Sequence, residues 1–339
     1  MKVEEPINWM PSVAVVVPMH NAVPWLPQLL AALVKEWDVS FELIAVDDSS
    51  SDGSANMVRS LCNHWPAHRW RLLKAGGRGV SAARNQAVAA TQAPVIAFLD
   101  ADDRPMQGRL ASPLQALQDH PELAHVHGGW WRTDASGALQ HPVRPWREGA
   151  DFGWREVIEH KAVLPSAWTI RRQAFLDVGG FDSRISHSED VDLLVRLAAA
   201  GYRGAWVSDL LVRYRVHPGS ASGRLKAQLD GLLDVLERHL KDAPEQMKGW
   251  ACQQRYDTTT WSCWQAWSAG QPDFALQLLC RALRSCPYPL PRRPVHLLEV
   301  FHRSCARVGE SFDRASFQLT PFWRTAQEML LCPIEAADG

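Results

Sequence analysis

The chain has 339 residues, of which 46% are hydrophobic and 22% are charged, and its formal net charge is −1. This length is enough for one large domain or two smaller ones, each with a buried core. Because nucleic-acid-binding proteins are usually clearly basic, the near-neutral charge argues against a nucleic-acid partner.

The N-terminal segment MKVEEPINWMPS is too acidic and too poor in apolar residues for a signal peptide. No apolar run approaches the roughly 20 residues of a membrane-spanning helix. The seven cysteines form no CxxC pair, which favours a reduced, intracellular chain. We therefore expect a cytoplasmic protein, with peripheral contact at the inner face of the membrane as the alternative.

The first part of the chain alternates between strand-like and helix-like segments. The strand patterns cover residues 13–18, 41–48, 69–75 and 95–100, and the helical patterns cover 25–37, 54–65 and 80–91. This alternation is typical of right-handed βαβ units and an open parallel sheet. Ligands of such sheets collect at the carboxyl ends of the strands, where residues 18–21, 47–52 and 100–103 fall.

The pattern becomes mixed beyond residue 120. Strand-like segments at 124–134, 166–172 and 206–218 accompany a helix at 187–202 that opens with acidic residues. Beyond about Gly223 the sequence is helical. There, residues 264–287 predict a helix–turn–helix unit resembling one tetratricopeptide repeat, without a second copy. We expect an α/β domain over 1–222 and a helical region over 223–339.

The stretch LDADD, residues 99–103, places Asp100, Asp102 and Asp103 at the end of a buried strand. Like charges this close are unfavourable unless a cation lies among them. Mg²⁺ and Mn²⁺ prefer oxygen ligands and are commonly held by one or two carboxylates together with substrate phosphates. By itself, the stretch is equally consistent with a divalent metal site and with an acidic helix-capping turn.

Three other segments are candidates for nucleotide binding or for the catalytic general base. VDDSSSDGS (46–54) could accept hydrogen bonds from a nucleobase or ribose, or form a capped polar turn. GGRGVSAARNQAV (76–88) lacks the signatures of a P-loop or a dinucleotide site, and Arg84 would lie one turn into its helix. Ser188-Glu189-Asp190 either supplies a catalytic carboxylate or caps the helix that follows.

Six segments, in this order, resemble the motifs of family 2 glycosyltransferases with the GT-A fold: VVVPMHN, VDDSSSDGS, GVSAARNQAV, FLDADD, HSEDVDLLVRL and VRYRVHPGSAS. The resemblance spans about residues 11–222. It implies a Rossmann-like, mostly parallel sheet flanked by helices, a nucleotide-sugar donor (first of all a UDP-sugar), and Mn²⁺ or Mg²⁺. It also implies inverting, non-processive transfer to a glycan or lipid-linked acceptor, in polysaccharide or glycoconjugate assembly.

The resemblance also implies roles for individual residues. The nucleotide group comprises Pro18, His20, Asn21, Asp47, Asp48, Arg84 and Asp100. The metal group comprises Asp102 as the principal ligand, Asp100 as its DxD partner and Asp103 as the next choice. The catalytic pair is Asp190, as general base, and Glu189.

Two inferences about this site follow from chemistry alone. Direct displacement at an anomeric carbon needs a carboxylate near the acceptor hydroxyl, opposite the departing diphosphate, so the base must be separate from the metal carboxylates. His217, before a Pro-Gly turn, is a candidate metal ligand or donor to the diphosphate, with a structural histidine as the alternative. Arg213 and Arg215 flank it and would face either the phosphates or solvent.

Other function classes fit less well. A sugar nucleotidyltransferase would carry an early glycine- and lysine-bearing signature, and a nicotinamide dehydrogenase would carry GxGxxG where PMHNAVP stands. A non-catalytic binding or scaffold protein of the same fold would be expected to lose its carboxylates. Processive synthesis is disfavoured because no QxxRW-like motif and no membrane span occur.

The C-terminal region is basic around the proline-rich segment PYPLPRRP. One hypothesis is peripheral contact with anionic lipid, which would bring the enzyme to a lipid-linked acceptor. The alternatives are a solvated helical face and a homodimer surface. The basic positions are Arg281, Arg284, Arg292, Arg293, Arg303 and Arg307.

Overall fold

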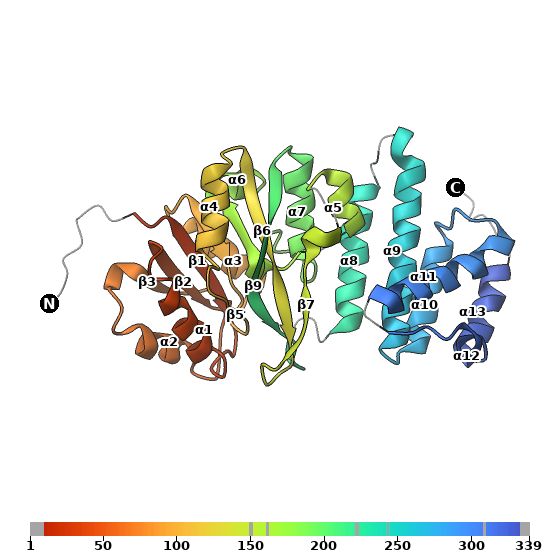
Figure 1. Cartoon of the computed structure of the whole chain (residues 1–339), viewed down its shortest axis with the longest axis horizontal. Coiled ribbons are helices and arrows are strands. Elements are labelled where there is room, and N and C mark those ends of the chain that lie inside the picture. The colour runs from red at the N-terminus through yellow and green to blue at the C-terminus, as the bar shows by residue number, and fades with distance from the viewer. Residues whose placement is uncertain are drawn as a thin grey trace. The chain divides into compact units, whose positions relative to one another are not determined.

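The computed structural model describes residues 10–332 apart from 149–151, 161–162, 221–223, 242, 244 and 308–309. The chain forms two compact units, the N-terminal unit Met1–Gly223 and the C-terminal unit Arg224–Gly339 (Figure 1). The N-terminal unit combines a sheet with helices, whereas the C-terminal unit is helical.

A nine-stranded sheet forms the centre of the N-terminal unit. Its strands are β1 (Val13–Met19), β2 (Phe41–Asp47), β3 (Trp70–Lys74), β4 (Val95–Phe98), β5 (Arg104–Pro105), β6 (Leu123–Thr133), β7 (Leu139–Val143), β8 (Trp168–Arg171) and β9 (Arg203–Arg215). They lie in the order β3-β2-β1-β4-β8-β6-β9-β5, and β7 pairs with β6.

The sheet is parallel in its first half and mixed beyond it. The parallel pairs β1–β2, β1–β4 and β2–β3 agree with the βαβ alternation of the sequence. β8 then runs antiparallel to both β4 and β6, and β9 runs parallel to β6. β6 and β9 therefore run in the same direction as β1, so their carboxyl ends lie at the edge where β1, β2 and β4 also end.

Helices flank this sheet. They are α1 (Leu26–Leu33), α2 (Ser54–Cys62), α3 (Val80–Ala89), α4 (Ala111–Asp119), α5 (Trp154–His160), α6 (Arg172–Asp177) and α7 (Glu189–Ala199). The helix expected over 25–37 is shorter in the structure, because a 3₁₀ turn at Val34–Glu36 follows α1. That turn brings the buried carboxylate of Glu36 to the start of α4, where it accepts from the backbone N–H groups of Gly108 and Leu110 at 2.8 and 3.0 Å.

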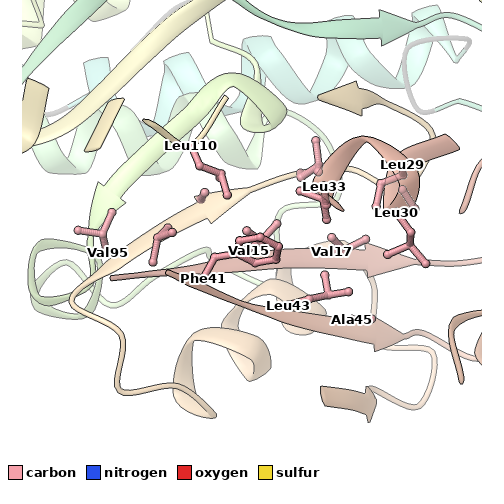
Figure 2. Packing of buried hydrophobic residues seen from close by; sticks show 14 of the residues in the cluster. Val15, Val17, Leu29, Leu30, Leu33, Phe41, Leu43, Ala45, Val95 and Leu110 are labelled. Carbon is pink, nitrogen blue, oxygen red and sulfur yellow. The ribbon is translucent and has the colours of Figure 1, made fainter. Parts of the chain in front are cut away.

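The main core lies between β1 and α1. Figure 2 shows Val15 and Val17 of β1 on the side of Leu29 and Leu33 of α1, and all four side chains are buried. Every residue of β1 is buried, as expected of a parallel strand covered on both faces. This is why its sequence is a continuous apolar run without polar alternation.

The C-terminal unit consists of helices. They are α8 (Leu225–Leu240), α9 (Lys248–Ser268), α10 (Pro272–Leu283), α11 (Arg293–Arg307), α12 (Arg314–Gln318) and α13 (Pro321–Leu331). α9 and α10 pack together as a helix–turn–helix unit, but its first helix begins at Lys248, well before the range expected over 264–287. Among the described residues, no helix combines the length and apolar character required to span a bilayer.

Gly204 in β9 packs directly against the buried imidazole of His125 in β6. A Cβ atom at position 204 would lie 2.1 Å from Cε1 of His125, whose ring is also in contact with Phe152 and Trp168. Gly204→Ala is therefore expected to lower the free energy of unfolding by about 1–3 kcal/mol, measured by chemical denaturation. Gly249→Ala in α9 is the matched control, since its Cβ would meet no atom within 4 Å. Equal destabilisation by both variants would contradict this packing.

Candidate active site

The loops after β1 and β2 are joined by hydrogen bonds. His20 Nδ1 donates to the carbonyl oxygen of Asp48 at 2.8 Å, and Ser51 N donates to Asn21 Oδ1 at 2.9 Å. Asn21 N donates in turn to Ser50 Oγ at 3.0 Å. Asn21 has a φ of 51°, a left-handed conformation that asparagine tolerates better than most residues. The expected nucleotide residues of these two loops are thus neighbours in space.

The two aspartates at the end of β2 have different surroundings. Asp47 is buried, and its Oδ1 accepts from Ser50 N at 3.1 Å. The two carboxylate oxygens of Asp48 accept from the backbone N–H groups of Arg78 and Gly79 at 2.9 and 2.8 Å. Asp48 therefore anchors the glycine-rich loop before α3, a structural role that the sequence did not indicate.

Arg84 of α3 forms a bridge between two candidate groups far apart in the sequence. Its guanidinium donates to Asp100 Oδ1 at 2.6 Å and to Glu189 Oε1 at 2.8 Å, and the residue is only 2% exposed. Although burial acts to lower the pKa of Arg84, the Asp100 and Glu189 carboxylates raise it above its usual value. The end of β4 and the start of α7 are thus tied together through one buried cation.

The second aspartate of LDADD contacts a histidine from the end of β9. Asp102 Oδ2 lies 3.1 Å from His217 Nε2, and the Asp102 side chain is 26% exposed. Burial, and after it the neighbouring Asp100 carboxylate, raises the pKa of Asp102. The His217 ring packs against Trp25, with ring centroids 4.4 Å apart. His217 is thus held beside the carboxylate that the sequence favours most as a metal ligand.

The third aspartate, Asp103, is buried in the protein. It is 2% exposed, and its Oδ1 accepts from the backbone N–H of Arg215 at 2.9 Å. Burial, followed by the charges of Asp102 and Asp100, raises the pKa of Asp103 well above its usual value. This burial argues against the metal role expected for Asp103 and indicates a structural one.

Arg215 does not face solvent, which was one of the two options that the sequence left open. It is buried, and its side chain donates to the carbonyl oxygens of Asp102 and Ala135 and to Gln28 Oε1, each at 3.0 Å. The guanidinium therefore supplies these three oxygen atoms with the hydrogen bonds that water would otherwise provide. Arg215 therefore positions the LDADD turn from the side of β9.

The expected base lies at the first turn of α7. Asp190 Oδ1 accepts from Val191 N at 2.8 Å, whereas Ser188, at the N-cap position with φ 62°, makes no side-chain capping hydrogen bond. Burial, and after it the adjacent Glu189 carboxylate, raises the pKa of Asp190 to about 7. Of the two neighbouring carboxylates, Glu189 is paired with Arg84. Asp190 has no hydrogen bond to an arginine among the described residues.

The polar groups suit a metal that is shared with a phosphate ligand. Among the described residues, no three His, Cys, Asp or Glu side chains are grouped so that they could hold a metal ion by themselves. Asp102 and His217 nevertheless bring a carboxylate oxygen and an imidazole nitrogen to one point. Mg²⁺ and Mn²⁺ bound with substrate phosphates commonly use only one or two protein ligands, so this donor pair fits such an ion.

Two residues that support the site were missed in the sequence. Ser166 Oγ accepts from Asp100 N at 2.9 Å, and Arg109 Nε donates to the carbonyl oxygen of Ser166 at 2.7 Å. Arg109 is buried and also donates to the carbonyl oxygens of Phe98 and Trp168, both at 2.9 Å. Burial lowers the pKa of Arg109 to about 10. No local motif marks either residue, because their partners are distant in the chain.

Two family models match the chain. The model of glycosyl transferase family 2 matches residues 14–178, and that of glycosyl transferase family group 2 matches residues 163–297. The chain belongs to the family 2 glycosyltransferases. The family expected from the six motifs is thereby confirmed.

One relative of this family 2 chain is a pre-mycofactocin glycosyltransferase of Mycobacterium tuberculosis. It is 34% identical over 201 residues, which cover 56% of this chain and 40% of the relative. The chain therefore spans less than half of the length of that relative.

Solved structures support the expected fold class. A mannosyltransferase from Pyrobaculum calidifontis, in complex with GDP-Man and Mn²⁺, superposes with a TM-score of 0.60 at 20% identity, covering 95% of this chain and 85% of its own. S. aureus TarS in complex with UDP-GlcNAc superposes with a TM-score of 0.59 at 14% identity, covering 89% of this chain and 93% of its own. The α/β fold of the GT-A type is confirmed by these likenesses.

Proposed function

We propose that the protein is a metal-dependent, inverting glycosyltransferase that moves a sugar from a nucleotide-diphosphate sugar to a hydroxyl group of a glycan or lipid-linked acceptor. The observation that carries the proposal is the bridge from Asp100 through Arg84 to Glu189. This bridge brings the two carboxylate motifs, separate in the sequence, to one site. Membership of the family supports the reaction class.

The donor side of the site lies at the ends of β1, β2 and β4. His20, Asn21 and Asp48 would line the nucleoside pocket, at the loops that their hydrogen bonds hold together. The two solved structures named above contain GDP-Man and UDP-GlcNAc, both nucleotide-diphosphate sugars. We expect the same donor class here, with a UDP-sugar as the first to test.

Asp102 and His217 would hold Mn²⁺ or Mg²⁺. Such an ion, when bound, neutralises charge on a diphosphate leaving group. Asp100, held by Arg84, would support this edge of the site and limit the repulsion between neighbouring carboxylates.

Asp190 would accept the proton of the acceptor hydroxyl. The hydroxyl oxygen forms a bond to the anomeric carbon as the bond from that carbon to the diphosphate oxygen breaks, so the configuration is inverted. A pKa near 7 suits this task, because the carboxylate is ionised in much of the population at neutral pH and is still a stronger base than an ordinary aspartate.

A donor-binding screen tests this proposal. UDP-, GDP-, dTDP- and CMP-sugars are added with and without Mn²⁺, and thermal unfolding is recorded. A ligand at a hundred times its dissociation constant stabilises the folded protein by about 2.7 kcal/mol, so one donor should raise the melting temperature in a Mn²⁺-dependent manner.

Asp102→Ala should remove this shift, while Asp38→Ala, which changes an exposed carboxylate after α1, should retain it. The absence of a shift with every donor would contradict the proposal and favour a non-catalytic relative. Nucleoside triphosphates are added in a separate arm of the same screen, and a shift with a triphosphate alone would favour a nucleotidyltransferase. Peripheral lipid contact and homodimer formation by the C-terminal unit stay predictions of the sequence.

A further inference from the structure

The C-terminal unit contains a pocket between α8, α9 and α10, three helices that can be followed in Figure 1. Its volume is about 470 Å³. Pockets for small molecules typically measure roughly 300–1,000 Å³, so the space is sufficient for a compact ligand. All of its lining residues belong to the C-terminal unit, so it is separate from the donor and metal groups of the N-terminal unit.

The walls of the pocket are cationic. Arg255 from α9 and Arg281 and Arg284 from the end of α10 line it, against a single carboxylate, that of Glu237. With Asp234, which pairs with Arg281 from outside the lining, three arginines face two carboxylates, so the excess is one positive charge. Each of the three arginines contributes a positive charge, because arginine side chains stay protonated in proteins.

Ion pairs hold two of these guanidinium groups in place. Arg255 Nε lies 2.7 Å from Glu237 Oε2, and an Arg281 nitrogen lies 3.2 Å from Asp234 Oδ1. Arg284 is exposed and has no carboxylate at ion-pair distance in the described part of the chain. The pocket thus combines two oriented guanidinium groups with a third whose hydrogen-bond donors are available.

The inner side of the pocket is apolar. Leu233 and Leu236 of α8 line it and are almost completely buried. Cys252 of α9 also lines it, and its thiol donates to the carbonyl oxygen of Ser285 at 3.1 Å. A ligand that fills this space would therefore have an apolar part beside the leucines and an anionic part beside the arginines.

We propose that this pocket binds an organic phosphate, with the phosphate at Arg281 and Arg284 and the apolar part against Leu233 and Leu236. Guanidinium groups match phosphate oxygens in bidentate geometry, and charge-assisted hydrogen bonds of this type are the strong ones. Two sources carry this chemistry: the headgroup of an anionic lipid and a soluble phosphate ester. The proposal does not depend on the reaction proposed for the N-terminal unit.

Cys252 offers a direct measure of ligand occupancy in the unmodified chain of 339 residues. The chain is treated with a thiol-alkylating reagent, and the labelling rate of each cysteine is followed by peptide mass spectrometry. Hexyl phosphate should slow the labelling of Cys252, which lines the pocket, and leave the exposed Cys280 unchanged. Hexanol should have no effect, because it has the apolar part without the charge.

Arginine variants test the anionic half of the pocket. Arg284→Gln should raise the dissociation constant of hexyl phosphate about tenfold, since hydrogen bonds to charged groups are among the stronger ones. Arg324→Gln, which changes an exposed arginine of α13 outside the lining, is the matched control and should bind as the unmodified protein does. Circular dichroism of both variants checks that they fold.

Two kinds of vesicle distinguish a lipid headgroup from a soluble phosphate ester as the ligand. Slower labelling of Cys252 with vesicles of phosphatidylcholine and phosphatidic acid, but not with phosphatidylcholine alone, assigns the site to a lipid headgroup. Slower labelling with hexyl phosphate and none with vesicles assigns it to a soluble ester. Unchanged labelling with every phosphate, or equal protection by hexanol, would overturn the proposal.

Discussion

Replacement of Asp190 by Asn is expected to lower the rate of sugar transfer by about 10²–10⁴-fold, the usual contribution of a general base. Asparagine has nearly the same shape and keeps an oxygen that can accept from Val191 N, as Asp190 Oδ1 does at 2.8 Å. The fold and the binding of donor should therefore be retained. The rate is measured with saturating donor and acceptor, and donor binding by calorimetry.

The pH dependence gives an independent check on the same residue. The carboxylate must be ionised to accept a proton, and its pKa is raised to about 7 by burial and by Glu189. Transfer by the unmodified protein should fall as the pH is lowered through about 7 and level off above it.

The control for this experiment is Asp38→Asn, which removes an exposed carboxylate beyond the end of α1. It should keep both the rate and the pH profile. Full activity of Asp190→Asn would refute the assignment of Asp190 as the base. A rate that does not change between about pH 5 and 8, the interval around the raised pKa of about 7, would also refute it.

Replacement of Arg84 by Met is expected to destabilise the N-terminal unit by about 3–5 kcal/mol, the usual cost of removing one partner from a buried ion pair. The Arg84 side chain is 3% exposed and pairs with two carboxylates, Asp100 and Glu189. Methionine fills much of the volume but leaves both carboxylates without their cation. The loss is measured from the denaturant dependence of unfolding.

A second substitution distinguishes charge from packing. If the cost arises from unbalanced carboxylates, Glu189→Gln should be less harmful in the Arg84→Met background than alone, and a double-mutant cycle measures the difference. Arg59→Met, which changes an exposed arginine of α2, should alter stability by less than about 0.5 kcal/mol. Strictly additive effects of the first two substitutions would show that the bridge contributes no coupling.

The parallel half of the fold could be predicted from the sequence because its signals are local. The apolar runs at β1, β2 and β4 and the helical spacing between them depend on residues close in the chain. The same parallel pairing predicted that Asp48 and Asp100, which follow β2 and β4, would lie at one edge of the sheet, and their binding roles stay predictions.

The mixed half and the supporting contacts could not be predicted in this way. β8 is short, and nothing in its own residues indicates that it pairs antiparallel with both β4 and β6. Two buried arginines illustrate this: no local motif marks Arg109, and Arg215 was expected to face either phosphates or solvent. Their role depends on carbonyl groups that approach from other strands, and this is a property of the assembled sheet.

The contacts made by β9 and the residues after it have a consequence for how this protein folds during its own translation. Arg215 and His217 contact Asp103 and Asp102 across separations of 112 and 115 residues. A ribosome adds residues vectorially, and long-range contacts of this kind form late because their loop closure is costly. The first four strands can therefore pair on a nascent chain while the LDADD turn still lacks its contacts with Arg215 and His217. The site is completed only when the last strand of this unit joins the sheet.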